Sequence, residues 1–200
     1  MLKNLQIPRT AKPFIYYIYR IMGSCSTKTT VIRSTTLKIA LVGNAVSGKT
    51  SILTRFANNQ FPQTYKHNTK NFVAVKSYLV NEASTPITIE IWEIQSNPSL
   101  QMDLALIVAD ITMPISDLQD YYWKWFQVCQ SYGWTNVNVV LSKKDLSPFI
   151  DPNYSSKIQE LLVLSPEQRV FLTSSLNNEG VDVMFKSLLS IGKNIEYHYY

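Results

Sequence analysis

Residues 43–50 (GNAVSGKT) have the types and spacing needed to bind phosphate, because they follow the pattern G-x-x-x-x-G-K-[ST]. Gly43 and Gly48 permit a tight backbone path in which successive N–H groups point inward toward an anion. Lys49 provides a cation for the terminal phosphates, and the hydroxyl of Thr50 can ligate Mg²⁺. The predicted phosphate-binding residues, which include the residue after the motif, are Gly43, Asn44, Ala45, Val46, Ser47, Gly48, Lys49, Thr50 and Ser51.

The segments on both sides of this loop supply the context that the motif requires. Residues 37–42 (LKIALV) predict a short apolar strand, and residues 51–57 (SILTRFA) predict the start of a helix. The N-terminus of that helix would add partial positive charge beside the phosphates. The alternative is a chance strand–turn–helix that happens to contain a lysine, and the flanking pattern disfavours it.

The order of apolar and polar segments predicts an α/β fold with a mostly parallel six-stranded sheet flanked by helices. After the first strand, further strands are expected at residues 72–80, 86–94, 104–108, 137–141 and 170–172. Helices are expected at residues 115–132 (with Ser116 as N-cap), 151–162 and 180–194. The predicted domain spans residues 37–196, followed by a short tail at 197–200. Ligands of such folds bind at the carboxyl ends of the strands.

Two polar motifs follow predicted strands at this same edge. Lys143, Lys144 and Asp145 come after one buried strand, and Ser174 and Ser175 follow the next. The Asp145 carboxylate could accept two N–H groups from guanine that adenine lacks, while backbone N–H groups near Ser174 could face the guanine carbonyl oxygen. Taken singly, the first motif is typical of a solvated turn and the second of a helix cap. Their order at adjacent strand ends predicts a guanine site.

With these motifs, the sequence resembles the Ras superfamily of small GTPases, most closely Rab-like members, over about residues 37–195. The resemblance rests on GNAVSGKT at 43–50, IWE at 91–93, SKKD at 142–145, TSS at 173–175, and Phe61 and Tyr65 in the first switch. It implies a P-loop NTPase fold, a small G domain with GTP or GDP as ligand, Mg²⁺ as cofactor, and protein effectors, commonly in vesicle trafficking. It also implies guanine contacts from Phe61, Lys143, Lys144, Asp145, Ser174 and Ser175, and a metal site at Thr50, Thr69 and Glu93.

The departures from the family pattern cluster where hydrolysis would occur. Residues 93–97 (EIQSN) stand where the family has D-T-A-G-Q, so Glu93 replaces an aspartate and Ser96 a glycine. Asn97 replaces the glutamine that orients the attacking water, and a misplacement on the order of 1 Å can cost about a hundredfold in rate. Asn97 is therefore expected to be a weak catalytic residue. The family threonine that ligates Mg²⁺ is replaced by Asn68, and Thr69 follows it.

Further departures concern the base site and the second switch. Ser142 replaces an asparagine that braces the phosphate loop, and Leu176 replaces a lysine that flanks the base. The segment at residues 97–104 is several residues shorter than the corresponding segment of the family, which predicts that the second switch helix is missing. The sequence therefore predicts a GTP/GDP switch with slow or impaired GTP hydrolysis. The alternative is a pseudo-GTPase scaffold that recruits partners without a hydrolysis cycle. A small-molecule kinase would need an arginine-rich lid, which is absent.

The composition is that of a globular protein, with 46% hydrophobic and 16% charged residues. Its net charge of +5 is uneven, because no Asp or Glu precedes Glu82 while that stretch contains twelve Lys or Arg. A basic half suits a polyphosphate or an anionic membrane, and no motif supports nucleic acid as a partner. The two cysteines, Cys25 and Cys129, are too few for a disulfide framework and favour a reducing, cytoplasmic location.

Residues 1–36 predict a flexible basic extension that could lie on a membrane. Their apolar run at 14–22 is too short to span one and contains Arg20. Residues 22–27 (MGSCST) match the N-myristoylation pattern at Gly23, with Cys25 placed for palmitoylation, provided that Gly23 becomes the N-terminus. A chance match is the alternative. The chain ends in IEYHYY without a cysteine, so prenylation there is not expected.

Overall fold

The computed structural model of the protein describes residues 35–64, 71–78, 87–95, 100–147 and 149–192. The chain divides into two units, Met1–Arg33 and Ser34–Tyr200, and all described residues belong to the second. The predictions for the N-terminal extension, Tyr65, Asn68, Thr69, Ser96 and Asn97 lie outside the described residues. No helix in the described part of the chain is long and apolar enough to cross a membrane.

A six-stranded sheet forms the centre of this unit, as the sequence predicts. Its strands are β1 (Thr35–Val42), β2 (Phe72–Tyr78), β3 (Ile87–Glu93), β4 (Leu104–Asp110), β5 (Val137–Ser142) and β6 (Val170–Leu172). They lie in the order β2-β3-β1-β4-β5-β6, and only the β2–β3 pair is antiparallel. Strand β5 is buried throughout and β4 up to its last residue, because helices cover both faces of these strands.

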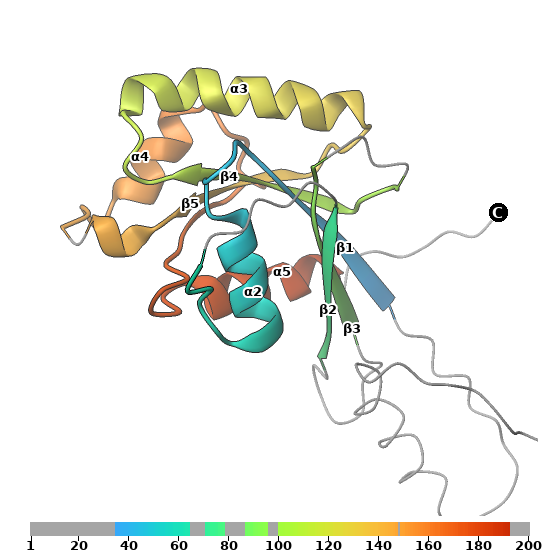
Figure 1. Cartoon of the computed structure of the whole chain (residues 1–200). Helices are drawn as coiled ribbons and strands as arrows, with labels where there is room; N and C mark the ends of the chain where they lie inside the picture. The colour runs from blue at the N-terminus through green and yellow to red at the C-terminus, as the bar shows by residue number, and fades with distance from the viewer. Residues whose placement is uncertain (1–34, 65–70, 79–86, 96–99, 148, 193–200) are drawn as a thin grey trace, which may run out of the picture. The chain divides into compact units, whose positions relative to one another are not determined.

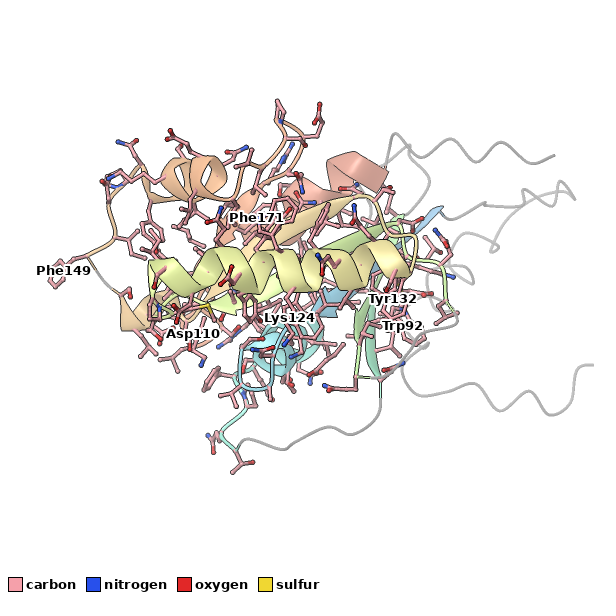
Figure 2. The ribbon with its side chains drawn as sticks, turned by 90° about the horizontal axis from the view of Figure 1, so that it is seen from above. Trp92, Asp110, Lys124, Tyr132, Phe149 and Phe171 are labelled. Atoms are coloured by element: carbon pink, nitrogen blue, oxygen red, sulfur yellow. The ribbon has the colours of Figure 1, made fainter. Side chains whose placement is uncertain are left out.

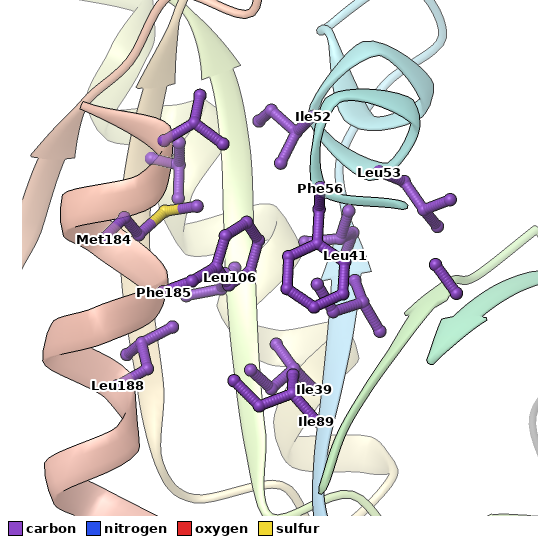
Figure 3. Close-up of a cluster of buried hydrophobic side chains, with 14 of the residues drawn as sticks. Ile39, Leu41, Ile52, Leu53, Phe56, Ile89, Leu106, Met184, Phe185 and Leu188 are labelled. Atoms are coloured by element: carbon purple, nitrogen blue, oxygen red, sulfur yellow. The ribbon is translucent and has the colours of Figure 1, made fainter. Parts of the chain in front are cut away.

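Helices α2 (Lys49–Asn58) and α5 (Val181–Gly192) cover one face of the sheet (Figure 1). Their apolar residues meet the sheet and each other, and the rings of Phe56 and Phe185 lie 4.5 Å apart between centroids. Figure 3 shows this cluster, in which Ile52 and Met184 also face the strands. The same helix that follows the phosphate loop is therefore fixed by the core, so burial of apolar surface positions the loop.

Helices α3 (Ile115–Ser131) and α4 (Tyr154–Leu161) cover the other face, over a second core cluster. Viewed from above, Asp110 lies near the start of α3 and Tyr132 at its end (Figure 2). Phe149 is fully exposed and points away from the protein in the same view. Cys129 of α3 and Trp134 after it are buried in this cluster, and burial raises the pKa of the Cys129 thiol to about 12.

Two boundary predictions were wrong. Pro114, not Ser116, is the N-cap of α3, because the Pro114 carbonyl accepts the N–H groups of Asp117 and Leu118. The hydroxyl of Ser116 instead donates to its neighbour Asp117. Helix α4 begins three residues later than predicted, since the Asp151 side chain and carbonyl hold residues 151–154 in a turn. Residues 100–103, within the short β3–β4 connection, are not helical, in agreement with the predicted lack of a second switch helix.

The carboxyl ends of the parallel strands lie along one edge of the sheet and carry the predicted motifs. The phosphate loop follows β1, Asp110 ends β4, and Lys143 follows β5. Backbone hydrogen bonds join neighbouring strand ends: Lys144 N–H donates to Thr173 C=O at 3.0 Å, and Thr173 N–H donates to Leu141 C=O at 2.9 Å. The topology thus gathers motifs separated by more than a hundred residues.

Candidate nucleotide-binding site

The phosphate loop has a backbone that its glycines make possible. Gly43 and Gly48 have φ angles of 145° and 98°, which other residues rarely adopt. A Cβ on Gly43 would lie 2.4 Å from the carbonyl oxygen of Val108, and one on Gly48 would lie 2.9 Å from Ser142 Oγ. The loop must therefore run against β4 and β5 without side chains at these two positions. Val46 has a φ of 63° and its side chain is 60% exposed at the tip of the loop.

The ammonium group of Lys49 lies within the loop. Its Nζ donates to the carbonyl oxygens of Gly43 at 2.9 Å and Asn44 at 2.7 Å, and only 5% of the residue is exposed. Burial lowers the pKa of Lys49, and the charge of Glu93 opposes that effect. The loop carbonyls thus hold a buried cation where the sequence predicts terminal phosphates.

Two of the three predicted metal ligands lie together. The Thr50 hydroxyl contacts both carboxylate oxygens of Glu93, at 2.9 and 2.8 Å, and Glu93 is 2% exposed. The amide of Gln95 donates to the same carboxylate at 2.8 Å. Thr69, the third predicted ligand, lies outside the described residues.

This pair of oxygen ligands fits Mg²⁺. Mg²⁺ prefers oxygen, keeps several waters and is usually bound through one or two protein groups plus substrate phosphates. Among the described residues there is no cluster of three or more His, Cys, Asp or Glu side chains that would form an all-protein cage. The Thr50–Glu93 pair supplies hard oxygens beside the phosphate loop and leaves the remaining coordination to water and phosphate.

Helix α3 holds the back of the phosphate loop at Asn44. The hydroxyl of Tyr121 accepts the Asn44 N–H at 2.8 Å and donates to the Val108 carbonyl at 2.7 Å. One turn later, Trp125 Nε1 donates to the Asn44 side-chain oxygen at 3.2 Å. Burial raises the pKa of Tyr121, against the effect of the Asn44 N–H. The N–H of Asn44 is therefore committed to Tyr121 and does not point to a phosphate, unlike the sequence-based expectation.

The two predicted guanine motifs meet. Ser174 Oγ donates to Asp145 Oδ1 at 2.5 Å, and the Ser174 N–H donates to the Glu179 carbonyl at 2.8 Å. The side chain of Lys144 forms an ion pair with Glu179, which ties the two segments together from outside. Because Ser174 occupies one carboxylate oxygen, Asp145 is oriented and still has acceptor capacity for a base.

Lys143 and Phe61 are two further residues that the resemblance assigns to the guanine site. Lys143 has a φ of 61° and its Nζ pairs with Asp110 at 2.6 Å, so its charged end is fixed at the end of β4. Burial alone would raise the pKa of Asp110, but the hydrogen bonds from Lys143 and Thr112 outweigh it, and the pKa lies below its usual value. Phe61 is 41% exposed, so its ring is accessible.

The brace between β5 and the phosphate loop is kept despite the substitution at Ser142. Its Oγ lies 2.6 Å from the Ser47 carbonyl and 3.1 Å from that of Ala109. Ser142 is 2% exposed, and its short side chain reaches the loop because Gly48 allows a close approach. A serine at this position therefore keeps a hydrogen bond between β5 and the phosphate loop. Leu176, which replaces the family lysine, is 53% exposed.

A comparison with family models decides the family. The model described as "Ras of Complex, Roc, domain of DAPkinase" matches residues 38–145, more than half of the chain. The chain belongs to the Roc family. This is a GTPase domain of the Ras superfamily, and the match includes the phosphate loop, Glu93 and Asp145. No individual curated protein matches the sequence.

The family match and the structure are complementary. The match ends at Asp145, so it does not include Ser174 and Ser175. These residues join the site through the Ser174–Asp145 hydrogen bond. Sequence reasoning missed Tyr121 and Trp125, because aromatic residues at helical spacing are usually core residues. It also missed Arg55, whose only sequence signal was its place in the helix after the phosphate loop.

Proposed function

We propose that this Roc domain binds GDP and GTP with Mg²⁺ and acts as a nucleotide-dependent switch. The observation that carries the proposal is the Ser174–Asp145 hydrogen bond, which assembles a guanine-reading carboxylate at the same sheet edge as a phosphate loop. A phosphate loop alone would fit many nucleotides, whereas a fixed carboxylate acceptor selects a purine with N–H donors on that edge. The family match supports the same assignment.

Each group has a defined part in binding. The loop N–H groups and the N-terminus of α2 would surround the phosphates, and the Lys49 ammonium would contact the terminal ones. Thr50 and Glu93 would hold Mg²⁺. When bound, Mg²⁺ neutralises charge on the β- and γ-phosphates. Asp145 would accept N–H groups of guanine, and exposed Phe61 and the Lys143 stem would flank the ring.

We further propose that GTP hydrolysis is slow. Glu93 is one methylene longer than the family aspartate and already contacts Thr50 directly, and Asn97 replaces the water-orienting glutamine. The alternative, a pseudo-GTPase scaffold without a hydrolysis cycle, shares the binding site and differs only in turnover. In both cases effectors would recognise the nucleotide-dependent surface.

Fluorescent GDP, GTP and ATP, titrated with and without Mg²⁺, test this function. The wild type is expected to bind both guanine nucleotides and to discriminate against ATP. Lys49→Ala should lose binding to every nucleotide, while Asp145→Asn should lose only guanine selectivity. Equal affinity for ATP and GTP would contradict the proposed guanine selectivity. Single-turnover GTP hydrolysis then separates a slow GTPase from a scaffold with no turnover.

A Rab-like role in vesicle trafficking is a finer proposal, and the sequence motifs alone support it. A lipid anchor at Gly23 and Cys25 would place such a switch on a membrane. Intact mass measurement of the protein from its native cells tests the anchor. A mass that corresponds to unmodified protein beginning at Met1 would exclude it.

A further inference from the structure

Arg55, near the end of α2, grips the turn that carries Ser174 and Ser175. Its Nε donates to the Ser175 carbonyl and its Nη2 to the Leu176 carbonyl, both at 2.8 Å. Its third donor, Nη1, contacts the Asn59 carbonyl at 2.8 Å and so closes the C-terminus of its own helix. Two of the three hydrogen bonds therefore reach a segment about 120 residues away in the sequence.

The remainder of this turn is fixed from other directions. Ser174 is buried, donates its N–H to Glu179 and contacts Asp145 through its hydroxyl. Gly180 follows with a φ of 74°, and a Cβ there would lie 2.2 Å from the Leu172 carbonyl. Arg55 contacts the part of the turn that these interactions leave unfixed, namely the peptide groups on both sides of Leu176.

The grip of Arg55 determines where the N–H groups of the turn point. A trans peptide group is planar, so its C=O and N–H point in opposite directions. Because the Ser175 carbonyl faces Arg55, the Leu176 N–H in the same peptide group faces away from it. Within the described residues, no backbone hydrogen bond uses the N–H of Ser175 or Leu176. Arg55 therefore orients the Leu176 N–H, and this donor has no backbone partner among the described residues.

We propose that Arg55 is a positioning residue for guanine recognition, because it orients the N–H group of Leu176 toward the O6 oxygen of the base. The inference rests on the proposed function and deepens it. Asp145 would read the N–H edge of guanine, and the Arg55-held turn would read the carbonyl. Helix α2 then connects both ends of the nucleotide, with Lys49 and Thr50 at its first turn and Arg55 at its last.

Three nucleoside diphosphates distinguish recognition of the guanine O6 oxygen from recognition of its 2-amino group. GDP has both O6 and the 2-amino group, 6-thio-GDP replaces O6 with sulfur, a weaker acceptor, and IDP retains O6 but lacks the 2-amino group. Arg55→Met, which removes all three donors, should weaken GDP and IDP binding about tenfold, the size of one directed hydrogen bond. Binding of 6-thio-GDP should change by less than about twofold, since its acceptor already interacts weakly.

Arg55→Lys and Lys157→Met serve as controls. Arg55→Lys retains the charge but cannot make the forked contact, so its GDP affinity should lie between those of wild type and Arg55→Met. Lys157→Met removes a surface cation on α4 and should change no affinity. Melting curves measured without nucleotide identify any variant that fails to fold, in which case the Arg55→Lys comparison carries the test.

The outcomes are distinguishable from failure of the proposed function. If wild-type protein binds none of the three diphosphates, the proposed function itself is wrong. If wild type binds GDP but Arg55→Met weakens all three ligands by the same factor, Arg55 only stabilises the fold and the inference is overturned. A selective loss for the two ligands that contain O6 supports it.

Discussion

The hydroxyl of Tyr121 lies 2.8 Å from the backbone nitrogen of Asn44, so a helix on one face of the sheet holds the phosphate loop from behind. The same hydroxyl donates to the Val108 carbonyl of the central strand β4. A single buried phenol thus connects α3, β4 and the loop. Pre-organisation of this kind raises ligand affinity because the loop loses less freedom on binding.

Tyr121→Phe should therefore weaken GDP binding by about tenfold, because the Asn44 N–H loses its partner and the loop its anchor. The measurement is the dissociation constant for fluorescent GDP in Mg²⁺. Tyr122→Phe is the matched control, since Tyr122 is also buried on α3 but its hydroxyl contacts Gln168, away from the loop. If both variants lose thermal stability equally and neither loses GDP affinity, the Tyr121 contact has no role in binding.

Gly43→Ala should abolish nucleotide binding and destabilise the fold by about 1–3 kcal/mol, as overpacked cores do. The new methyl group would lie 2.4 Å from the Val108 carbonyl and 2.7 Å from Tyr121 Oη. The measurements are denaturant unfolding and GDP titration.

Gly133→Ala is the control for backbone strain in that experiment. Gly133 also has a positive φ of 76°, but no atom lies within 4 Å of its Cβ position. This variant should lose about 1–2 kcal/mol from strain alone and retain GDP binding. Equal behaviour of the two alanine variants would show that the close approach to β4 is unimportant.

Asp110→Asn should make the protein less sensitive to acid. The pKa of Asp110 is lowered in the folded state, so its contribution to stability is present above its unfolded pKa of about 4 and is lost as pH falls. Removing the carboxylate removes both the Lys143 ion pair and this titration. The free energy of unfolding, measured at pH 6 and pH 3, should differ less in the variant than in wild type.

Asp117→Asn provides the comparison for Asp110, because Asp117 is an exposed acid of α3 that contacts only Ser116 among the described hydrogen-bond partners of its side chain. Because this substitution leaves the Asp110–Lys143 ion pair in place, Asp117→Asn should lose more stability between pH 6 and pH 3 than Asp110→Asn does. An Asp110→Asn variant that loses stability in acid as steeply as wild type would mean that the ion pair, which is partly solvated, contributes little.

The sequence was sufficient for the sheet because apolar periodicity reports burial directly. The continuous apolar run at residues 104–108 of β4 indicated a strand covered on both faces, and residues 137–141 of β5 indicated another buried strand; the structure confirms both. The sequence could not identify polar contacts of side chains that also fit an ordinary core or surface role. Tyr121 looks like a core residue and Arg55 like a solvated helix residue, and only the packing of distant segments reveals their polar contacts.

The substitution at Ser142 shows a second limit of the sequence. Comparison by residue type treats the loss of an asparagine as the loss of its hydrogen bonds. In the folded protein the distance between β5 and the phosphate loop is short enough for a hydroxyl, and the contact to Ser47 remains. The residue type shows which hydrogen bonds a side chain can form. The distance between the two backbone segments decides whether that side chain is long enough to form them.

The last prediction concerns Glu93 and Gln95, which we expect to work as a pair. Glu93 is a longer side chain than the family aspartate, so its carboxylate has one more torsion to fix. The Gln95 amide contacts Oε1 of that carboxylate at 2.8 Å, an oxygen that the Thr50 hydroxyl also contacts, at 2.9 Å, and the family has alanine at the position of Gln95. Gln95 is therefore a second described restraint on this carboxylate, beside the Thr50 hydroxyl.

Gln95→Ala should raise the Mg²⁺ concentration needed for half-maximal retention of GDP by about threefold to tenfold, the range of one hydrogen bond to a charged group. In a Glu93→Asp background, the same Gln95→Ala change should have little effect, because the shorter carboxylate cannot reach the amide and needs less restraint. The measurement is the GDP dissociation rate as a function of Mg²⁺ in wild type, both single variants and the double variant. If the Gln95→Ala effect is the same in both backgrounds, the two residues act independently, and the contact between them does not tune the metal site.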